Sequence, residues 1–185
     1  MTKIDIGLKK IKTIFHISDV HIRTIKRHKE YRQVFSKVYK EIEKRKDDSL
    51  IYLGGDLVHA KLEMSPELIQ MTSDFFRSLA DLAPTIIITG NHDCNLNNRY
   101  RLDALSPIIN NLNHPNLHYL MDSGVYEIGD CQFVVMSIFE GPKDYIKSKD
   151  VKGNNKIALF HGTIDNATTD FGYHLKDPKH TVNLF

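Results

Sequence analysis

Residues 86–93, Ile86-Ile87-Ile88-Thr89-Gly90-Asn91-His92-Asp93, join a short apolar run to three consecutive polar side chains. The apolar and β-branched residues of this run predict a strand buried on both faces of a sheet. Gly90 predicts a sharp turn, because glycine tolerates positive φ. Asn91, His92 and Asp93 then follow the carboxyl end of a strand, where α/β proteins place ligands. The stretch therefore predicts an α/β fold with a metal or phosphate site at this edge of the sheet.

Two earlier segments show the same pattern of an apolar run followed by polar residues. Residues 13–17 end in Ser18-Asp19-Val20-His21, and residues 50–53 end in Gly54-Gly55-Asp56. Amphipathic stretches at about 30–46 and 65–82 predict helices between the strands, the second opened by Ser65 as N-cap and Pro66 in the first turn. A parallel βαβαβ half of this kind brings all three strand ends to one edge.

The second half of the chain predicts shorter elements. A helix is expected over residues 101–112, interrupted by Pro107, and strands over 117–121, 125–128 and 132–139. Glycine-containing turns between these strands predict an antiparallel meander. Lys156–Phe160 reads as another buried strand, ending in His161-Gly162-Thr163.

Length and composition limit the class of protein. A chain of 185 residues with 41% hydrophobic residues predicts one core in a single domain spanning residues 1–185. No segment resembles a membrane span or a signal peptide, so we expect a soluble, cytoplasmic protein without a membrane partner. His16, inside the first strand, is interpreted as a core histidine. Cys94 and Cys131 suit no disulfide framework or zinc pair.

The charge is unevenly distributed along the chain. Residues 1–50 carry 14 Lys+Arg against 7 Asp+Glu, a net charge of +7, and the remainder carries 11 against 16, a net charge of −5. Solvated helix faces are one interpretation. The other is a basic surface beside an acidic metal site, which suits a polyanionic substrate. The basic loop with Arg23, Lys26 and Arg27 likewise reads as a phosphate contact or as a solvated loop.

The residues at the strand ends form one chemical set: Asp19, His21, Asp56, Asn91, His92, Asp93 and His161. Oxygen and imidazole ligands without thiolates favour Mn²⁺, Mg²⁺, Fe or Zn²⁺, and Mn²⁺ fits the mixture well. In an extended Asp19-Val20-His21 both outer side chains point to one ion. Asp56 could bridge two ions roughly 3.5–4 Å apart, which activate a water against a phosphoester. His92 could then protonate the leaving oxygen, with Asp93 orienting its ring.

Three motifs, Asp19-x-His21, Gly-Gly-Asp56-Leu-Val-His59 and Gly-Asn91-His92-Asp93, resemble the first three motifs of the calcineurin-like metallophosphoesterases. The second is similar to that of SbcD-type DNA double-strand-break-repair nucleases, including phage recombination endonucleases. The resemblance covers roughly residues 12–165. It implies a sandwich with helices on the outer faces. It also implies that Asp19, His21 and Asp56 hold one metal ion, that Asp56, Asn91 and His161 hold the other, and that His59 lies close to the substrate.

The same resemblance implies Mn²⁺-dependent cleavage of DNA, a homodimer and an SMC-like ATPase partner of SbcC type. The family's final Gly-His-x-His motif has no match in residues 164–185, so we expect an incomplete C-terminus near Leu184-Phe185 and a metal site short of ligands. Two alternatives stay open: a phosphodiesterase for a small phosphoester, and a truncated domain that binds DNA or a partner without catalysis.

Overall fold

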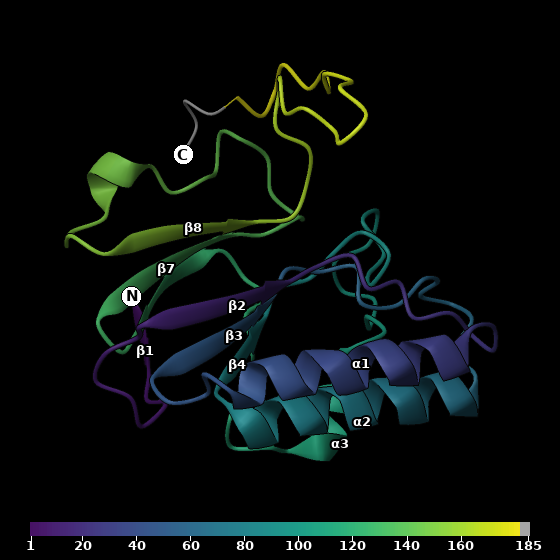
Figure 1. Cartoon of the computed structure of the whole chain (residues 1–185). Coiled ribbons are helices and arrows are strands. Elements are labelled where there is room, and N and C mark those ends of the chain that lie inside the picture. The colour runs from purple at the N-terminus through teal and green to yellow at the C-terminus, as the bar shows by residue number, and fades with distance from the viewer. Residues whose placement is uncertain (182–185) are drawn as a thin grey trace.

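The structure, a computed structural model, describes residues 1–181 and consists of three layers (Figure 1). The predicted end near Leu184-Phe185 lies outside the described residues. The helices are α1 (His28–Glu43), α2 (Pro66–Leu82), α3 (Ser106–Leu112) and a short 3₁₀ helix, η1 (Ser148–Asp150). The strands are β1 (Thr2–Ile4), β2 (Thr13–Ile17), β3 (Ser49–Leu53), β4 (Thr85–Ile87), β5 (Leu117–Tyr119), β6 (Gly124–Ile128), β7 (Cys131–Met136) and β8 (Lys156–Phe160).

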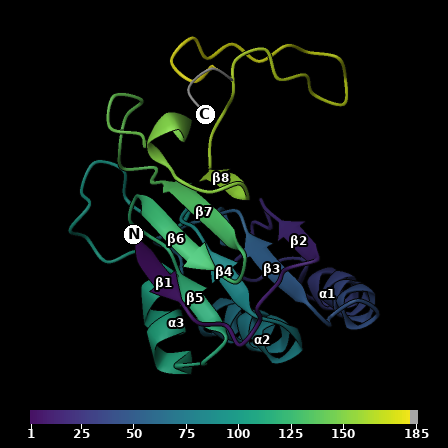
Figure 2. The same cartoon turned by 90° about the vertical axis from the view of Figure 1, so that its left-hand side faces the viewer.

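The strands form two stacked four-stranded sheets (Figure 2). One sheet has the order β2-β3-β4-β5 with every pair parallel. The other has the order β1-β6-β7-β8, in which β6 and β7 are antiparallel and both outer pairs are parallel. The predicted α/β class is confirmed, with β2-α1-β3-α2-β4 as its parallel half.

Strands β3 and β4 are buried on both faces, as their uninterrupted apolar sequences predict. Successive side chains of a strand point to opposite faces. Ile51, Leu53 and Ile87 therefore join the core beneath the helices, whereas Leu50 and Ile86 join the core between the sheets. The prediction of a single core was wrong, because a sheet covered on both sides has a hydrophobic cluster on each.

The three α-helices cover the outer face of the β2–β5 sheet (Figure 1). Helices α1 and α2 contact each other through Phe35 and Phe75, whose rings stack with centroids 4.1 Å apart. Ser65 caps α2 as predicted, since its Oγ accepts a hydrogen bond from the Leu68 N–H at 3.2 Å. No helix in the described part of the chain is long and apolar enough to cross a membrane.

Two predicted elements differ from the structure. The helix expected from residue 101 begins only at Ser106, because Asp103 accepts hydrogen bonds from the Leu105 and Ser106 N–H groups at 2.7 Å. Pro107 lies in its first turn and interrupts nothing. The antiparallel meander was also wrong: of its three predicted strands, β6 and β7 form an antiparallel pair, whereas β5 extends the other sheet, parallel to β4.

The edge strands are less buried than their sequences suggested. β2 and β8 are the last strands of their sheets, so each pairs with one strand among the described residues. His16 on β2 is exposed and stacks on Tyr52 with ring centroids 4.7 Å apart, so its interpretation as a core histidine was wrong. In β8 only Leu159 is buried, whereas Lys156 and Ala158 are exposed.

Candidate metal centre

The loops that follow β2 and β3 bring three predicted metal ligands together. The His21 Nε2 atom lies 3.8 Å from Asp19 Oδ1 and 3.6 Å from Asp56 Oδ2. Asp56 is almost fully buried, whereas Asp19 is exposed. Two carboxylates and one imidazole around a common point have the donor chemistry of a Mn²⁺-type site.

The loops after β4 and β8 supply the other two predicted ligands. The His161 Nε2 atom lies 3.4 Å from Asp56 Oδ1 and 3.2 Å from Asn91 Oδ1. The other ring nitrogen of His161, Nδ1, is 2.7 Å from the Gly54 carbonyl oxygen, which fixes the ring. The other four predicted ligands therefore gather around Asp56, although β8 belongs to the second sheet. Their role as ligands stays a prediction, and the donor set fits two divalent ions that share one carboxylate.

Three of these residues have an unusual backbone conformation. Asp19, His21 and Asp56 have φ values of 56°, 48° and 55°, in the left-handed region. The expectation of an extended Asp19-Val20-His21 was therefore wrong, and the turn itself brings the two side chains together. The Asp19 N–H donates to the Gly55 carbonyl at 3.1 Å and the His21 N–H to the Asp56 carbonyl at 3.0 Å. Such conformations cost about 1–3 kcal/mol each and cluster at functional sites.

Gly90 is required for a different reason from the one predicted. Its φ is not among the positive values, so the turn does not depend on a left-handed glycine. Instead, a Cβ atom at Gly90 would overlap the backbone nitrogen and the Oδ1 atom of Asp56. The glycine lets the β4 loop approach the central carboxylate closely.

Asp93 does not orient His92, contrary to the prediction. Its fully buried carboxylate accepts hydrogen bonds from the N–H groups of Asp56, Leu57, Val58 and Gly90 at 2.8–3.1 Å. Asp93 thereby satisfies three N–H groups of the turn after β3 and one, that of Gly90, of the loop after β4. Burial raises the pKa of Asp93 to about 6, although the N–H donors act in the opposite direction. Asp93 is thus a positioning residue for the loop that carries Asp56.

His92 is held instead by the peptide of His59. Its Nδ1 atom lies 2.6 Å from the His59 carbonyl oxygen, which leaves Nε2 free. Its own N–H donates to Asp56 Oδ1 at 2.8 Å. His92 therefore stands beside the central carboxylate with one ring nitrogen available for a ligand or a substrate oxygen.

The electrostatics of the centre favour a cation. Burial opposes ionisation of Asp56, but hydrogen bonds from His161 and from the His92 N–H lower its pKa. For His161, burial acts to lower the pKa. The hydrogen bond and the negative charge of Asp56 outweigh burial and raise the pKa of His161 to about 9. Since metal binding requires neutral imidazole, a divalent ion would displace the His161 proton.

The sequence analysis missed two residues that contact the centre. Lys61 donates its Nζ hydrogen bond to the Asn91 carbonyl at 2.8 Å. Tyr31, on α1, donates its hydroxyl to the His21 carbonyl at 2.6 Å. The position of Lys61 two residues after His59 is a weak signal, whereas nothing in the sequence marks Tyr31.

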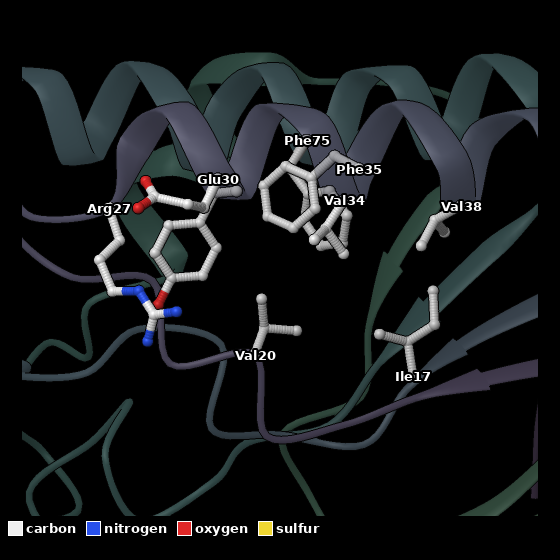
Figure 3. Close-up of a pocket in the computed structure, with 9 residues that line it drawn as sticks. Ile17, Val20, Arg27, Glu30, Val34, Phe35, Val38 and Phe75 are labelled. Carbon is white, nitrogen blue, oxygen red and sulfur yellow. The ribbon is translucent and has the colours of Figure 1, made fainter.

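An apolar cavity of about 310 Å³ lies on the helix side of the loop that carries the first ligands (Figure 3). Val20 lines it between Asp19 and His21, and Phe35 and Phe75 form its far wall. Arg27 lines this cavity, and Arg23 and Lys26 are exposed. Contact of these three cations with phosphate stays a prediction.

The fold and the donor set define a class of hydrolytic metalloprotein. The chain matches the calcineurin-like phosphoesterases over residues 12–183 and belongs to that family. It is also similar to an uncharacterized protein of Acanthamoeba polyphaga mimivirus, with 46% identity over 179 residues. The match covers 91% of this chain and 13% of the relative, so the chain spans about an eighth of that protein's length.

Proposed function

We propose that the chain is a two-metal phosphodiesterase that cleaves DNA. Its family implies metal-dependent hydrolysis of phosphoesters. The observation that carries the proposal is the convergence of Asp19, His21, Asn91 and His161 on the buried carboxylate of Asp56. A shared central carboxylate is the arrangement that two-metal phosphoester hydrolysis needs.

Each residue of the centre has a role in the proposed reaction. Asp19, His21 and Asp56 would hold one ion, and Asp56, Asn91 and His161 the other. When bound, the ion pair supplies an activated water and stabilises charge on the attacking and leaving oxygens. His92 keeps an Nδ1–H on the His59 carbonyl, and in its doubly protonated form its Nε2–H would donate a proton to the leaving oxygen, which leaves a neutral ring. Asp93 holds the Asp56 loop, and Lys61 holds the carbonyl of Asn91.

DNA as the substrate is supported by charge rather than by contacts. The first 50 residues have a net charge of +7, from 14 cationic and 7 acidic residues. Arg23 and Lys26 are exposed shortly after the ligand His21, and neither forms an ion pair within the part of the chain that the structure describes. Cations beside a metal centre suit a polyphosphate chain. The choice of Mn²⁺ rests on the oxygen and imidazole donors.

The primary test is Mn²⁺-dependent cleavage of end-labelled duplex DNA, with Asp56→Asn as the control. We expect the wild-type chain to cut the duplex and the variant to lose about 10³-fold in rate, since several kcal/mol of transition-state stabilisation disappear. Hydrolysis of bis(p-nitrophenyl) phosphate without any cleavage of DNA would contradict a DNA substrate and support a small phosphoester. If the chain binds metal but hydrolyses neither substrate, the proposed phosphodiesterase activity is refuted.

DNA contact by the basic loop is tested separately, without turnover. Neutralising Arg23, Lys26 and Arg27 in an Asp56→Asn background should make the negative slope of the logarithm of the DNA-binding constant against log salt shallower by up to about 3. Each lost phosphate contact reduces its magnitude by about 0.9. Neutralising Lys44, Arg45 and Lys46 removes the same charge from cations already paired with Glu41 and Glu43. Equal effects of the two triple variants would show that only net charge matters.

The homodimer and the SMC-like ATPase partner of SbcC type stay predictions from the resemblance. Helices α2 and α3, which pack against each other, are candidates for the dimer face. Light scattering of the purified chain would test the dimer, and a monomer at micromolar concentration would contradict it.

A further inference from the structure

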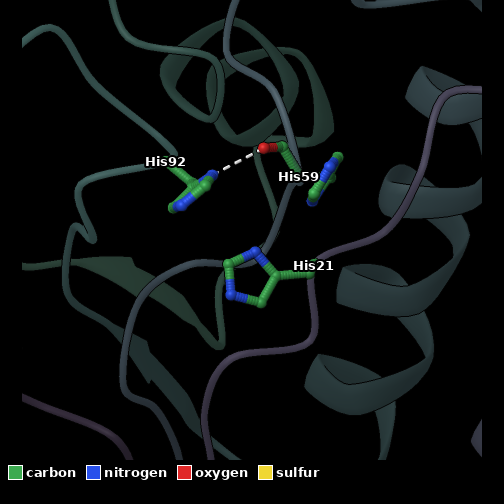
Figure 4. Close-up of side chains that lie close together, drawn as sticks. All are labelled: His21, His59 and His92. Atoms are coloured by element: carbon green, nitrogen blue, oxygen red, sulfur yellow. Dashed lines mark hydrogen bonds between the residues drawn. The ribbon is translucent and has the colours of Figure 1, made fainter.

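Three imidazoles form a second cluster beside the proposed metal centre. That centre, formed by Asp19, His21, Asp56, Asn91 and His161, is called the carboxylate-rich centre below. His21, His59 and His92 each offer a ring nitrogen, and the three nitrogens lie within 4.8 Å of one another. Figure 4 shows the rings of His92 and His59 on either side of a gap, with one nitrogen of His21 facing that gap. The centroids of His21 and His92 are 4.6 Å apart at right angles, and His59 is 5.8 Å from each.

The hydrogen bonding of His21 differs from that of the neighbouring histidines. His92 and His161 each fix Nδ1 on a backbone carbonyl, at 2.6 Å and 2.7 Å, and keep Nε2 for a ligand. A metal-binding histidine almost always anchors its second nitrogen in this way. In His21, Nε2 faces Asp19 and Asp56, whereas Nδ1 is buried and has no hydrogen-bond partner among residues 1–181. A buried ring nitrogen without a partner needs an explanation, and a metal ion is one.

We propose that His21, His59 and His92 form a separate Zn²⁺ site. Zinc is commonly bound in proteins by three histidines and a water, with Zn–N distances of about 2.0–2.1 Å. Tetrahedral coordination needs nitrogens about 3.4 Å apart, so the rings close by up to about 1.4 Å around the ion. The site contains no carboxylate, which disfavours the harder ions Mn²⁺ and Mg²⁺ relative to Zn²⁺.

This site shares His21 with the carboxylate-rich centre, and it also uses His92 beside that centre. A neutral imidazole has one lone pair, so zinc at Nδ1 leaves Nε2 of His21 protonated and unable to bind the ion that Asp19 and Asp56 would hold. Zinc also occupies the free Nε2 of His92, the proton donor of the proposed reaction. Zinc at this site would therefore inhibit the proposed reaction. The inhibition rests on the proposed function, but the binding of zinc does not depend on it.

The binding test uses metal-free protein, Zn²⁺ alone and two matched histidine-to-asparagine variants. His161→Asn removes a ligand of the carboxylate-rich centre and leaves the three imidazoles intact. His59→Asn removes one imidazole and leaves all five carboxylate-centre residues intact. By calorimetry we expect His161→Asn to bind one Zn²⁺ within a few-fold of the tightest wild-type affinity. His59→Asn should bind it more than about 100-fold more weakly, since even a lost outer contact costs 10–100-fold.

The converse titration with Mn²⁺ completes the test. We expect His59→Asn to keep Mn²⁺ binding and His161→Asn to lose it. Ring ¹⁵N spectra of the wild type should show zinc shifting His21, His59 and His92 together, and circular dichroism checks that both variants are folded. Unchanged zinc affinity in His59→Asn, or its loss in His161→Asn, would overturn the proposal. If His59→Asn is misfolded, His92→Gln replaces it with the same expectation.

The second part of the test measures whether zinc inhibits hydrolysis. Stoichiometric Zn²⁺ should abolish Mn²⁺-dependent hydrolysis in the wild type. Zinc bound at the three imidazoles with undiminished hydrolysis would refute the inhibitory role. Absence of any hydrolysis would count against the proposed function alone, because the two titrations decide the zinc site without a substrate.

Discussion

At Gly90, the absence of a Cβ atom lets the loop after β4 approach the loop after β3 that carries Asp56. A Cβ atom there would overlap Asp56, whereas one at Gly141 would meet nothing within 4 Å. We expect Gly90→Ala to weaken Mn²⁺ binding by about 10–100-fold, as for other displaced metal ligands, because the β4 loop must move away. Metal titration would measure this effect, with Gly141→Ala as the control. Equal affinities in the two variants would contradict it.

Cys94 is a buried thiol beside the proposed metal centre. Its side chain is buried and its thiol lies 3.4 Å from the Gly90 carbonyl. Burial raises the pKa of Cys94 to about 12, and burial also raises that of Cys131. Since the thiolate is the reactive form, we expect neither thiol to react with iodoacetamide at pH 8 until the chain is unfolded. Rapid labelling of the folded protein, followed by mass spectrometry, would disprove this.

At the scale of an element, Ser65 links two parts of the structure. Its Oγ accepts a hydrogen bond from the Leu68 N–H at the start of α2 and donates one to the carbonyl of Thr24, in the basic loop, at 2.7 Å. Ser65→Ala should therefore lower the free energy of unfolding by about 1 kcal/mol, the usual value of an N-cap. Urea denaturation measures this, and Ser36→Ala on the exposed face of α1 should change it by less than about 0.5 kcal/mol.

Strand β5 carries a histidine that should make stability depend on pH. His118 has a buried Nε2 atom without a hydrogen-bond partner in the described part of the chain, and burial lowers its pKa below 6.5. The unfolded chain therefore takes up this proton at a higher pH than the folded chain does. Stability is lost as pH falls through the unfolded value of 6.5.

We expect His118→Gln to reduce the loss of unfolding free energy between pH 7 and pH 5. Denaturation curves of the wild type and the variant at both pH values would measure the difference. A variant whose stability fell as steeply as that of the wild type would exclude His118 as the cause.

At the scale of the whole molecule, the proposed metal centre connects the two sheets. Asn91 follows β4 in one sheet and His161 follows β8 in the other, and both lie near Asp56. Mn²⁺ at 100 times its dissociation constant should stabilise the fold by about 2.7 kcal/mol. His161→Asn should gain less at the same Mn²⁺ concentration, and an equal gain in denaturation experiments would contradict a metal link between the sheets.

Much of the architecture follows from local sequence. Apolar runs that end in polar residues predicted β2, β3, β4 and β8, and the capping pattern at Ser65 predicted α2. Because parallel strands end at one edge, the same pattern predicted that Asp19, Asp56 and Asn91 would lie close together. The sequence did not predict β1, a three-residue strand that exists through its pairing with β6.

The sequence by itself determined the family and the set of side chains that meet at the centre, since both depend on motifs of neighbouring residues. Only the tertiary structure decided that Asp93 binds the Asp56 loop, that the His59 peptide holds His92, and that β5 joins the parallel sheet. These features depend on which backbone groups remain unpaired after distant segments pack together. A local pattern of residue types carries no information about such long-range pairing.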